Sequence, residues 1–203
     1  MKEVCVESFD EAVRAVEAGA TRIELCENLT VGGTTPSHGT IKKCIEKLNV
    51  PIMVMIRPRG GNFNYSADEF DIMKEDILQC LELKADGVVF GLLNELDGID
   101  EERTRQLVRM AGDMQVTFHK AIDVAKDILG CVEILKKTGV KRILSSGGER
   151  TALEGLEMLK KMIRLAEPEI KVIIAGKVSW ENFDEIRASI PSAEYHGRRL
   201  VPF

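Results

Sequence analysis

Proline is scarce in this sequence, with only 6 among 203 residues. Disordered chains are usually rich in proline and poor in apolar residues, whereas this chain is 44% apolar and 30% charged, which is a globular composition. The length suffices for one well-buried core and is short for two ordinary domains. We therefore predict that residues 1–203 form a single domain.

The sequence has neither an excess of positive charge nor a long apolar run. Lys and Arg number 28 against 33 Asp and Glu, for a net charge of −5, so no overall field favours nucleic acid, and any anion site must be local. Apolar stretches such as 51–56 are too short to span a bilayer, and residues 1–4 contain no apolar signal core. We expect neither a nucleic-acid partner nor a membrane partner.

Paired cysteine motifs are also missing. The five cysteines are odd in number and singly spread, without any C-x-x-C, which suits the reducing cytoplasm. The sequence contains no G-x-G-x-x-G opening, P-loop, H-E-x-x-H or EF-hand pattern. Dinucleotide, nucleoside triphosphate, zinc protease and calcium functions therefore have no support from motifs.

What the sequence does contain is a repeated helix-to-strand unit. Residues 18–25, 84–90 and 138–144 each end a predicted helix and begin a short apolar run, which is typical of a buried parallel strand. Eight strands are predicted in all, at 3–7, 22–25, 52–56, 87–90, 115–118, 142–144, 172–174 and 193–195. Strict alternation with helices predicts an α/β fold, a TIM-type (β/α)8 barrel with a parallel eight-stranded sheet. Only residues 197–203 follow, so the final helix is expected to be reduced or absent.

Apolar residues recur at helical spacing between these strands. Two such stripes are Phe70, Met73, Ile77 and Leu81, and Leu153, Leu156, Leu159 and Ile163. Serine or threonine followed three residues later by glutamate precedes several stripes, as in Thr151 and Glu154. This spacing is a capping box, so we interpret these carboxylates as structural.

Several motifs together resemble the CutC family of copper homeostasis proteins. They are ELCENL at 24–29, GGTTPS at 32–37, MIRPRGG at 55–61, DGVVFG at 86–91, TFHKAID at 117–123 and RILSSGG at 142–148. The resemblance covers nearly the whole chain. It implies a TIM-type barrel, a cytoplasmic location, oligomers and a role in copper handling, but no established reaction. Where the family usually has a glycine run, this chain has Ala175-Gly176-Lys177-Val178.

In barrels of this type the site lies where the strands end. We expect Glu24, Arg57 and His119 to converge on that mouth of the barrel, and we expect no comparable cluster at the opposite mouth. Unpaired charges do not belong inside a barrel, so their clustering at strand ends indicates function.

Thiols are the first candidate ligands, because Cu(I) is soft and prefers thiolate or thioether sulfur. Cys26 lies two residues beyond Glu24, and Cys5 lies on the neighbouring predicted strand. These two residues form the predicted copper site, with Cys5 alternatively a small buried apolar residue. The other three cysteines fall within predicted helices and are interpreted as packing residues.

An anion clamp is the second possibility. Arg57 and Arg59 precede a glycine pair, and their guanidinium groups match a phosphate or carboxylate. The alternative is a ring of salt bridges that joins both arginines to Glu7 and Glu24. The further residues of the predicted anion site are Glu7, Asn28, Ser145, Ser146, Gly147, Gly148 and Lys177.

Three residues are candidates for catalysis, namely Glu24, His119 and Asp123. If the chain is an enzyme, Glu24 or His119 would move a proton, and Asp123 would orient His119. His196, beside two arginines, is the weaker candidate. Two functions therefore stand side by side: a copper homeostasis protein that holds Cu(I), and a barrel acting on a small anionic metabolite.

We predict a homodimer in solution, because the missing final helix leaves barrel surface that a second chain would cover. Light scattering at micromolar concentration should give twice the chain mass. A monodisperse monomer, with the last residues packed over their own barrel, would contradict this prediction.

Overall fold

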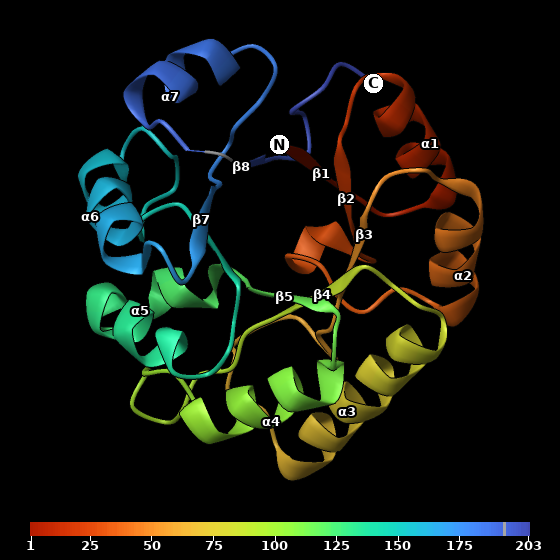
Figure 1. Ribbon diagram of the computed structural model, residues 1–203, viewed down its shortest axis with the longest axis horizontal. Helices are drawn as coiled ribbons and strands as arrows, with labels where there is room; N and C mark the ends of the chain where they lie inside the picture. Colours follow the sequence, from red (N-terminus) through yellow and green to blue (C-terminus); the bar gives the residue numbers. More distant parts are fainter. Residues whose placement is uncertain (193) are drawn as a thin grey trace.

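A computed structural model describes residues 1–192 and 194–203. Eight parallel strands form a closed barrel in chain order, and helices surround it (Figure 1). The strands are β1 (Lys2–Val6), β2 (Arg22–Leu25), β3 (Ile52–Met55), β4 (Gly87–Phe90), β5 (Gln115–Phe118), β6 (Arg142–Ser145), β7 (Lys171–Ile174) and β8 (Glu194–His196). The α-helices are α1 (Phe9–Glu17), α2 (His38–Lys47), α3 (Ala67–Glu82), α4 (Glu101–Ala111), α5 (Ile128–Lys136), α6 (Leu156–Ala166) and α7 (Phe183–Ser189). Two short 3₁₀ helices, η1 (Leu29–Val31) and η2 (Lys120–Val124), follow β2 and β5.

The structure confirms the predicted TIM-type barrel. Strands β2, β4 and β5 have the predicted bounds, and the others differ by a residue at one or both ends. Ala193, with which the eighth strand was predicted to begin, lies outside the described residues. No helix in the described ranges is long and apolar enough to cross a bilayer.

Two members of the predicted helical stripes do not belong to the core. Leu81 is exposed on α3, where Cys80 is buried instead. Leu153 precedes α6, which begins only at Leu156 although the capping bonds between Thr151 and Glu154 are present. Gly155, just before the helix, packs so tightly on the loop after β6 that a Cβ there would lie 1.9 Å from a carbonyl oxygen.

Each strand presents two different faces, since side chains alternate along a strand. The outward residues, such as Val4 and Val6 of β1, pack with the helices in one continuous apolar core. The inward residues are mixed. Met53, Met55 and Val89 form a small apolar cluster inside the barrel, whereas Glu3, Arg22 and Glu194 are buried charges.

The amino-terminal end of the barrel interior therefore holds a charged cluster, against our expectation. Arg22 forms salt bridges with both Glu3 and Glu194, and Arg142 Nε lies 3.2 Å from Glu194 Oε2. These residues begin their strands, and a parallel barrel brings strand starts together on its axis. The prediction that this mouth carries no comparable cluster was wrong. Charged residues can be buried there because each one pairs with an opposite charge.

The residues after β8 form no helix, as predicted. They lie between α7 and α1, where the ring of helices is open (Figure 1). Leu200 and Val201 are buried, and the backbone of Arg199 forms a parallel β-bridge with Ser179 in the loop after β7. The tail thus covers its own barrel, which weakens the reason for expecting a second chain there, and the homodimer stays a prediction.

We predict that Arg22→Met destabilises the protein by about 3–5 kcal/mol, the usual cost of leaving buried charges unpaired. Glu194 and Glu3 would both lose a buried partner. Urea unfolding measures the change. Arg164→Met, at an exposed position on α6, is the matched control and should change the unfolding free energy by less than about 0.5 kcal/mol. Equal stability of the two variants would show that the cluster contributes nothing.

Candidate functional site

A cavity of about 160 Å³ lies at the carboxyl ends of the strands. Its polar lining residues are Cys5, Glu24, Arg57, His119, Lys120 and His196, and its apolar ones include Met55, Phe63 and Leu144. Glu24, Arg57 and His119 thus share one cavity. Each also has a buried polar atom without a hydrogen-bond partner among the described residues, namely Glu24 Oε1, Arg57 Nε and His119 Nε2. Buried polar atoms are nearly always bonded, so these three require a ligand or water.

The floor of this cavity is formed by a histidine between two carboxylates. His196 Nδ1 lies 2.9 Å from Glu3 Oε1, and Nε2 lies 3.7 Å from Glu24 Oε2. The strand register explains the arrangement, because β1 pairs Glu3 with His196 on one side and Cys5 with Glu24 on the other.

These neighbours change the pKa values of the cluster. Burial alone would lower the pKa of His196, but the charge of Glu24 and the bonds to Cys5 and Glu3 raise it well above its usual value. Burial raises the pKa of Glu24, and His196 only partly offsets this. The pKa of Glu3 is lowered, because its bond to His196 and the charge of Arg22 outweigh burial. The cluster can therefore hold a proton at neutral pH.

Two thiols flank the same carboxylate. Cys26 Sγ lies 3.6 Å from Glu24 Oε2, and one ligand atom from each of Cys5, Glu24 and His196 lies within 4.8 Å of the others. Burial, followed by the charge of Glu24, raises the pKa of the Cys26 thiol well above its usual value. Sulfur, imidazole nitrogen and carboxylate oxygen thus converge as possible metal ligands, and the structure brings both predicted cysteines close to this group.

His119 and Asp123 do not act together. The amide of Ala121 donates to His119 Nδ1 at 3.2 Å, whereas Asp123 bonds to residues of another loop. Burial, followed by the charge of Arg57, lowers the pKa of His119 to about 3. The prediction that Asp123 orients His119 was wrong, because η2 turns the two side chains toward different partners.

Asp123 instead occupies the predicted anion loop after β6. Its carboxylate accepts bonds from the hydroxyls of Ser145 and Ser146 and from the amide of Ser146. The amide of Gly148 also donates to it at 3.1 Å, while the amide of Gly147 donates to the Ser145 hydroxyl. The loop therefore does bind an anion, but that anion is the chain's own aspartate.

Both arginines bind carbonyl oxygens of nearby loops. Arg57 donates to the carbonyl oxygens of residues 31, 33 and 61, and its guanidinium stacks over Phe63. Arg59 pairs with Glu69 at 2.5 Å and donates to the carbonyl oxygens of residues 60, 62 and 64. The alternative of a ring with Glu7 and Glu24 was also wrong, since neither carboxylate pairs with an arginine of this loop.

The other predicted anion-site residues lie apart from the cavity. Glu7 accepts a bond from the Leu29 amide at 2.6 Å and pairs with Arg198 at 3.0 Å. Asn28 is exposed, and its side-chain oxygen accepts a bond from the Thr30 hydroxyl. Lys177 lines a different cavity, near the ends of β7 and β8.

Sequence reasoning underrated His196 and missed Glu3. We judged a cationic histidine unfavourable beside Arg198 and Arg199, but both arginines are exposed while His196 points inward. Strand alternation is the signal that could have found both residues. Glu3 and Cys5 are alternate residues of β1, as Glu194 and His196 are of β8, so each pair points to the same side of the sheet.

A closed barrel of eight parallel strands, surrounded by helices and with a polar cavity at the strand ends, defines a (β/α)8 barrel protein. A model of the CutC family matches residues 1–200. The copper homeostasis protein cutC homolog of Homo sapiens is 41% identical over 196 residues, which cover 97% of this chain and 72% of the human protein. The chain belongs to the CutC family.

Solved structures agree with this assignment. A CutC structure from Streptococcus agalactiae is 36% identical, with a TM-score of 0.93 over 99% of each chain. A deoxyribose phosphate aldolase of Aeropyrum pernix has a TM-score of 0.66 over 98% of this chain and 86% of its own, at 14% identity. The latter likeness concerns the fold alone.

We predict that nitrogen-detected NMR titration shows opposite states for two buried histidines. His196 should be an imidazolium at pH 7, whereas His119 should stay neutral as the pH falls to about 5. Because the folded pKa of His196 is raised, its ion pairs stabilise the protein fully below about pH 6.5 and less as the pH rises through the folded value. His196→Gln should therefore lower the free energy of unfolding most at low pH. Titration of both rings near pH 6.5 would contradict the geometry.

Proposed function

We propose that this CutC-family protein binds Cu(I) inside the barrel, through Cys26 and Cys5 with His196 as an additional ligand. The observation that carries the proposal is the convergence of Cys5, Glu24 and His196 within 4.8 Å, with Cys26 Sγ 3.6 Å from Glu24. The copper homeostasis names of its relatives support a role with this metal.

The donor set fits Cu(I) chemically. Thiolate sulfur and imidazole nitrogen are ligands that Cu(I) accepts readily. The unpaired Glu24 Oε1 is a buried acceptor that a bound cation would neutralise. Since the ligands bind in their deprotonated forms, Cu(I) would expel protons from Cys26 and its neighbours on binding.

A cytoplasmic location is part of the same proposal. All five cysteines are free and buried, which suits a reducing compartment. Thiols kept reduced there stay available for Cu(I).

A titration against a matched chelator tests the copper proposal. Reduced wild-type protein should bind Cu(I) more tightly than Zn(II), and Cys26→Ser should remove this preference and weaken Cu(I) binding by more than about tenfold, or 1.4 kcal/mol. Cys80→Ser, at a buried position on α3 far from these ligands in the sequence, is the matched control and should behave as wild type. Equal Cu(I) affinity in both variants would mean that scattered thiols hold the metal.

The second candidate function is binding or conversion of a small anionic metabolite. It is favoured by the three residues with unpaired buried polar atoms, Glu24, Arg57 and His119, that line the cavity of about 160 Å³. A ligand there would accept a bond from Arg57 Nε and meet the neutral ring of His119. If the chain is an enzyme, Glu24 is placed to exchange a proton with this ligand, because burial raises its pKa.

A further inference from the structure

A second, larger cavity of about 600 Å³ opens where β7 and β8 end. Five cationic side chains line it, and the only carboxylate among its described lining residues is Glu181. The cations are Lys120, Arg150, Lys177, Arg198 and Arg199. Such a concentration contrasts with the net charge of −5 on the whole chain, and the side chains that line this cavity favour an anion.

Four of the five cations form ion pairs, mostly with carboxylates that do not line the cavity. Arg150 pairs with Glu154 at 3.8 Å. Arg199 pairs with Glu181 at 3.2 Å, and Lys120 with Asp123 at 3.4 Å. Arg198 pairs with Glu7 at 3.0 Å, and its side chain is 50% exposed. Lys177 forms no ion pair with any residue in the described ranges. A ligand anion would therefore complete the coordination of this lysine.

The backbone of Lys177 lies in the left-handed region. Its φ of 55° is left-handed, which costs a non-glycine residue about 1 kcal/mol or more. The side-chain amide of Asn182 holds it there by donating to the Lys177 carbonyl oxygen at 3.0 Å. At Gly176 a Cβ would lie 2.7 Å from Ser146, so the lysine follows a rigid contact between two loops. A glycine at position 177 would avoid the strain, but it would lack the ammonium group.

We propose that this cavity binds the phosphate group of a small phosphorylated metabolite, with Lys177 as its central cation and Arg198 and Arg199 as flanking donors. A phosphate monoester carries close to two negative charges at neutral pH and accepts charge-assisted bonds from several cations. The loops after strands seven and eight are a frequent place for such a group in (β/α)8 barrels.

The surroundings favour a small molecule over nucleic acid. Glu7, Glu11 and Glu181 pair with the arginines around this cavity and would repel a long polyanion. Lys120 and His196 line both this cavity and the interior one. A phosphate held here thus directs the rest of its molecule toward Glu24 and His196, and only this last step rests on the second candidate function.

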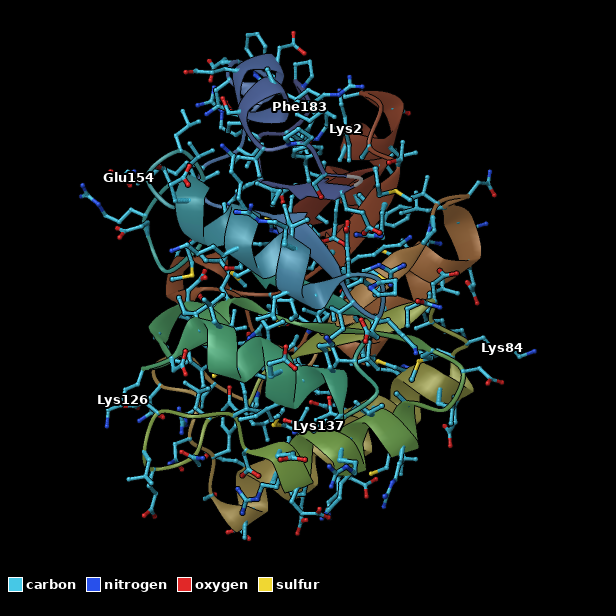
Figure 2. All side chains as sticks on the ribbon, turned by 60° about the vertical axis from the view of Figure 1, so that its left-hand side comes forward. Lys2, Lys84, Lys126, Lys137, Glu154 and Phe183 are labelled. Atoms are coloured by element: carbon cyan, nitrogen blue, oxygen red, sulfur yellow. The ribbon has the colours of Figure 1, made fainter. Side chains whose placement is uncertain are left out.

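Isothermal titration with inorganic phosphate and with glycerol 3-phosphate, at ionic strength matched by sodium chloride, tests the proposal. The decisive variant is Lys177→Gly, which removes the ammonium group and relieves the left-handed backbone. Lys84→Gly is the matched control, because Lys84 is also an exposed lysine with positive φ. It lies at the opposite end of the barrel from Glu154, whose loop follows β6 (Figure 2).

Wild type and Lys84→Gly should bind both ligands, with glycerol 3-phosphate the tighter, and Lys177→Gly should bind each about tenfold more weakly. Cys26→Ser should bind phosphate as wild type does, which separates this site from the copper site. Equal phosphate affinity in the two glycine variants, or no binding beyond the effect of salt, would overturn the phosphate site. Tighter binding of single-stranded DNA than of either small ligand would overturn the choice of a small molecule. Inorganic phosphate binding as tightly as glycerol 3-phosphate would overturn only the extension toward Glu24.

Discussion

The salt bridges that Arg22 forms with Glu3 and Glu194 connect β1, β2 and β8, the strands at which the barrel closes. Charges on the barrel axis are tolerable only because each one meets an opposite charge, since an unpaired buried charge would cost several kcal/mol. Glu3 also bonds to His196. The same carboxylate therefore belongs both to the ion pairs that close the barrel and to the candidate site.

Most of the polar groups at the carboxyl ends serve the protein's own architecture. Asp123 fills the loop after β6, and Arg57 and Arg59 bind the carbonyl oxygens of their own loops. The polar groups that have no such architectural role are the ones that indicate function. They lie around two adjoining cavities that share Lys120 and His196, one lined by thiol, carboxylate and imidazole groups and the other by cations.

Much of the fold could be predicted from the sequence, because each strand of a parallel barrel is a short apolar run after a helix. Strands β2, β4 and β5 were predicted to the residue. The site was harder. Cys26 and Glu24 follow from one strand, but the bond between Glu3 and His196 joins residues 193 positions apart, and no local pattern predicts a contact of that kind. The strand end predicted at Tyr195 left His196 outside the barrel.

The sequence by itself determined the eight alternating units, the family and the residues that end the strands, because periodicity and short motifs are local properties. Only the tertiary structure decided which charges neutralise one another. Barrel closure brings β8 beside β1 and so places His196 between two carboxylates. Loop packing likewise paired Asp123 with two serines, and left Lys177 without an ion pair among the described residues. Partner choice depends on distance in space, which a linear sequence does not contain.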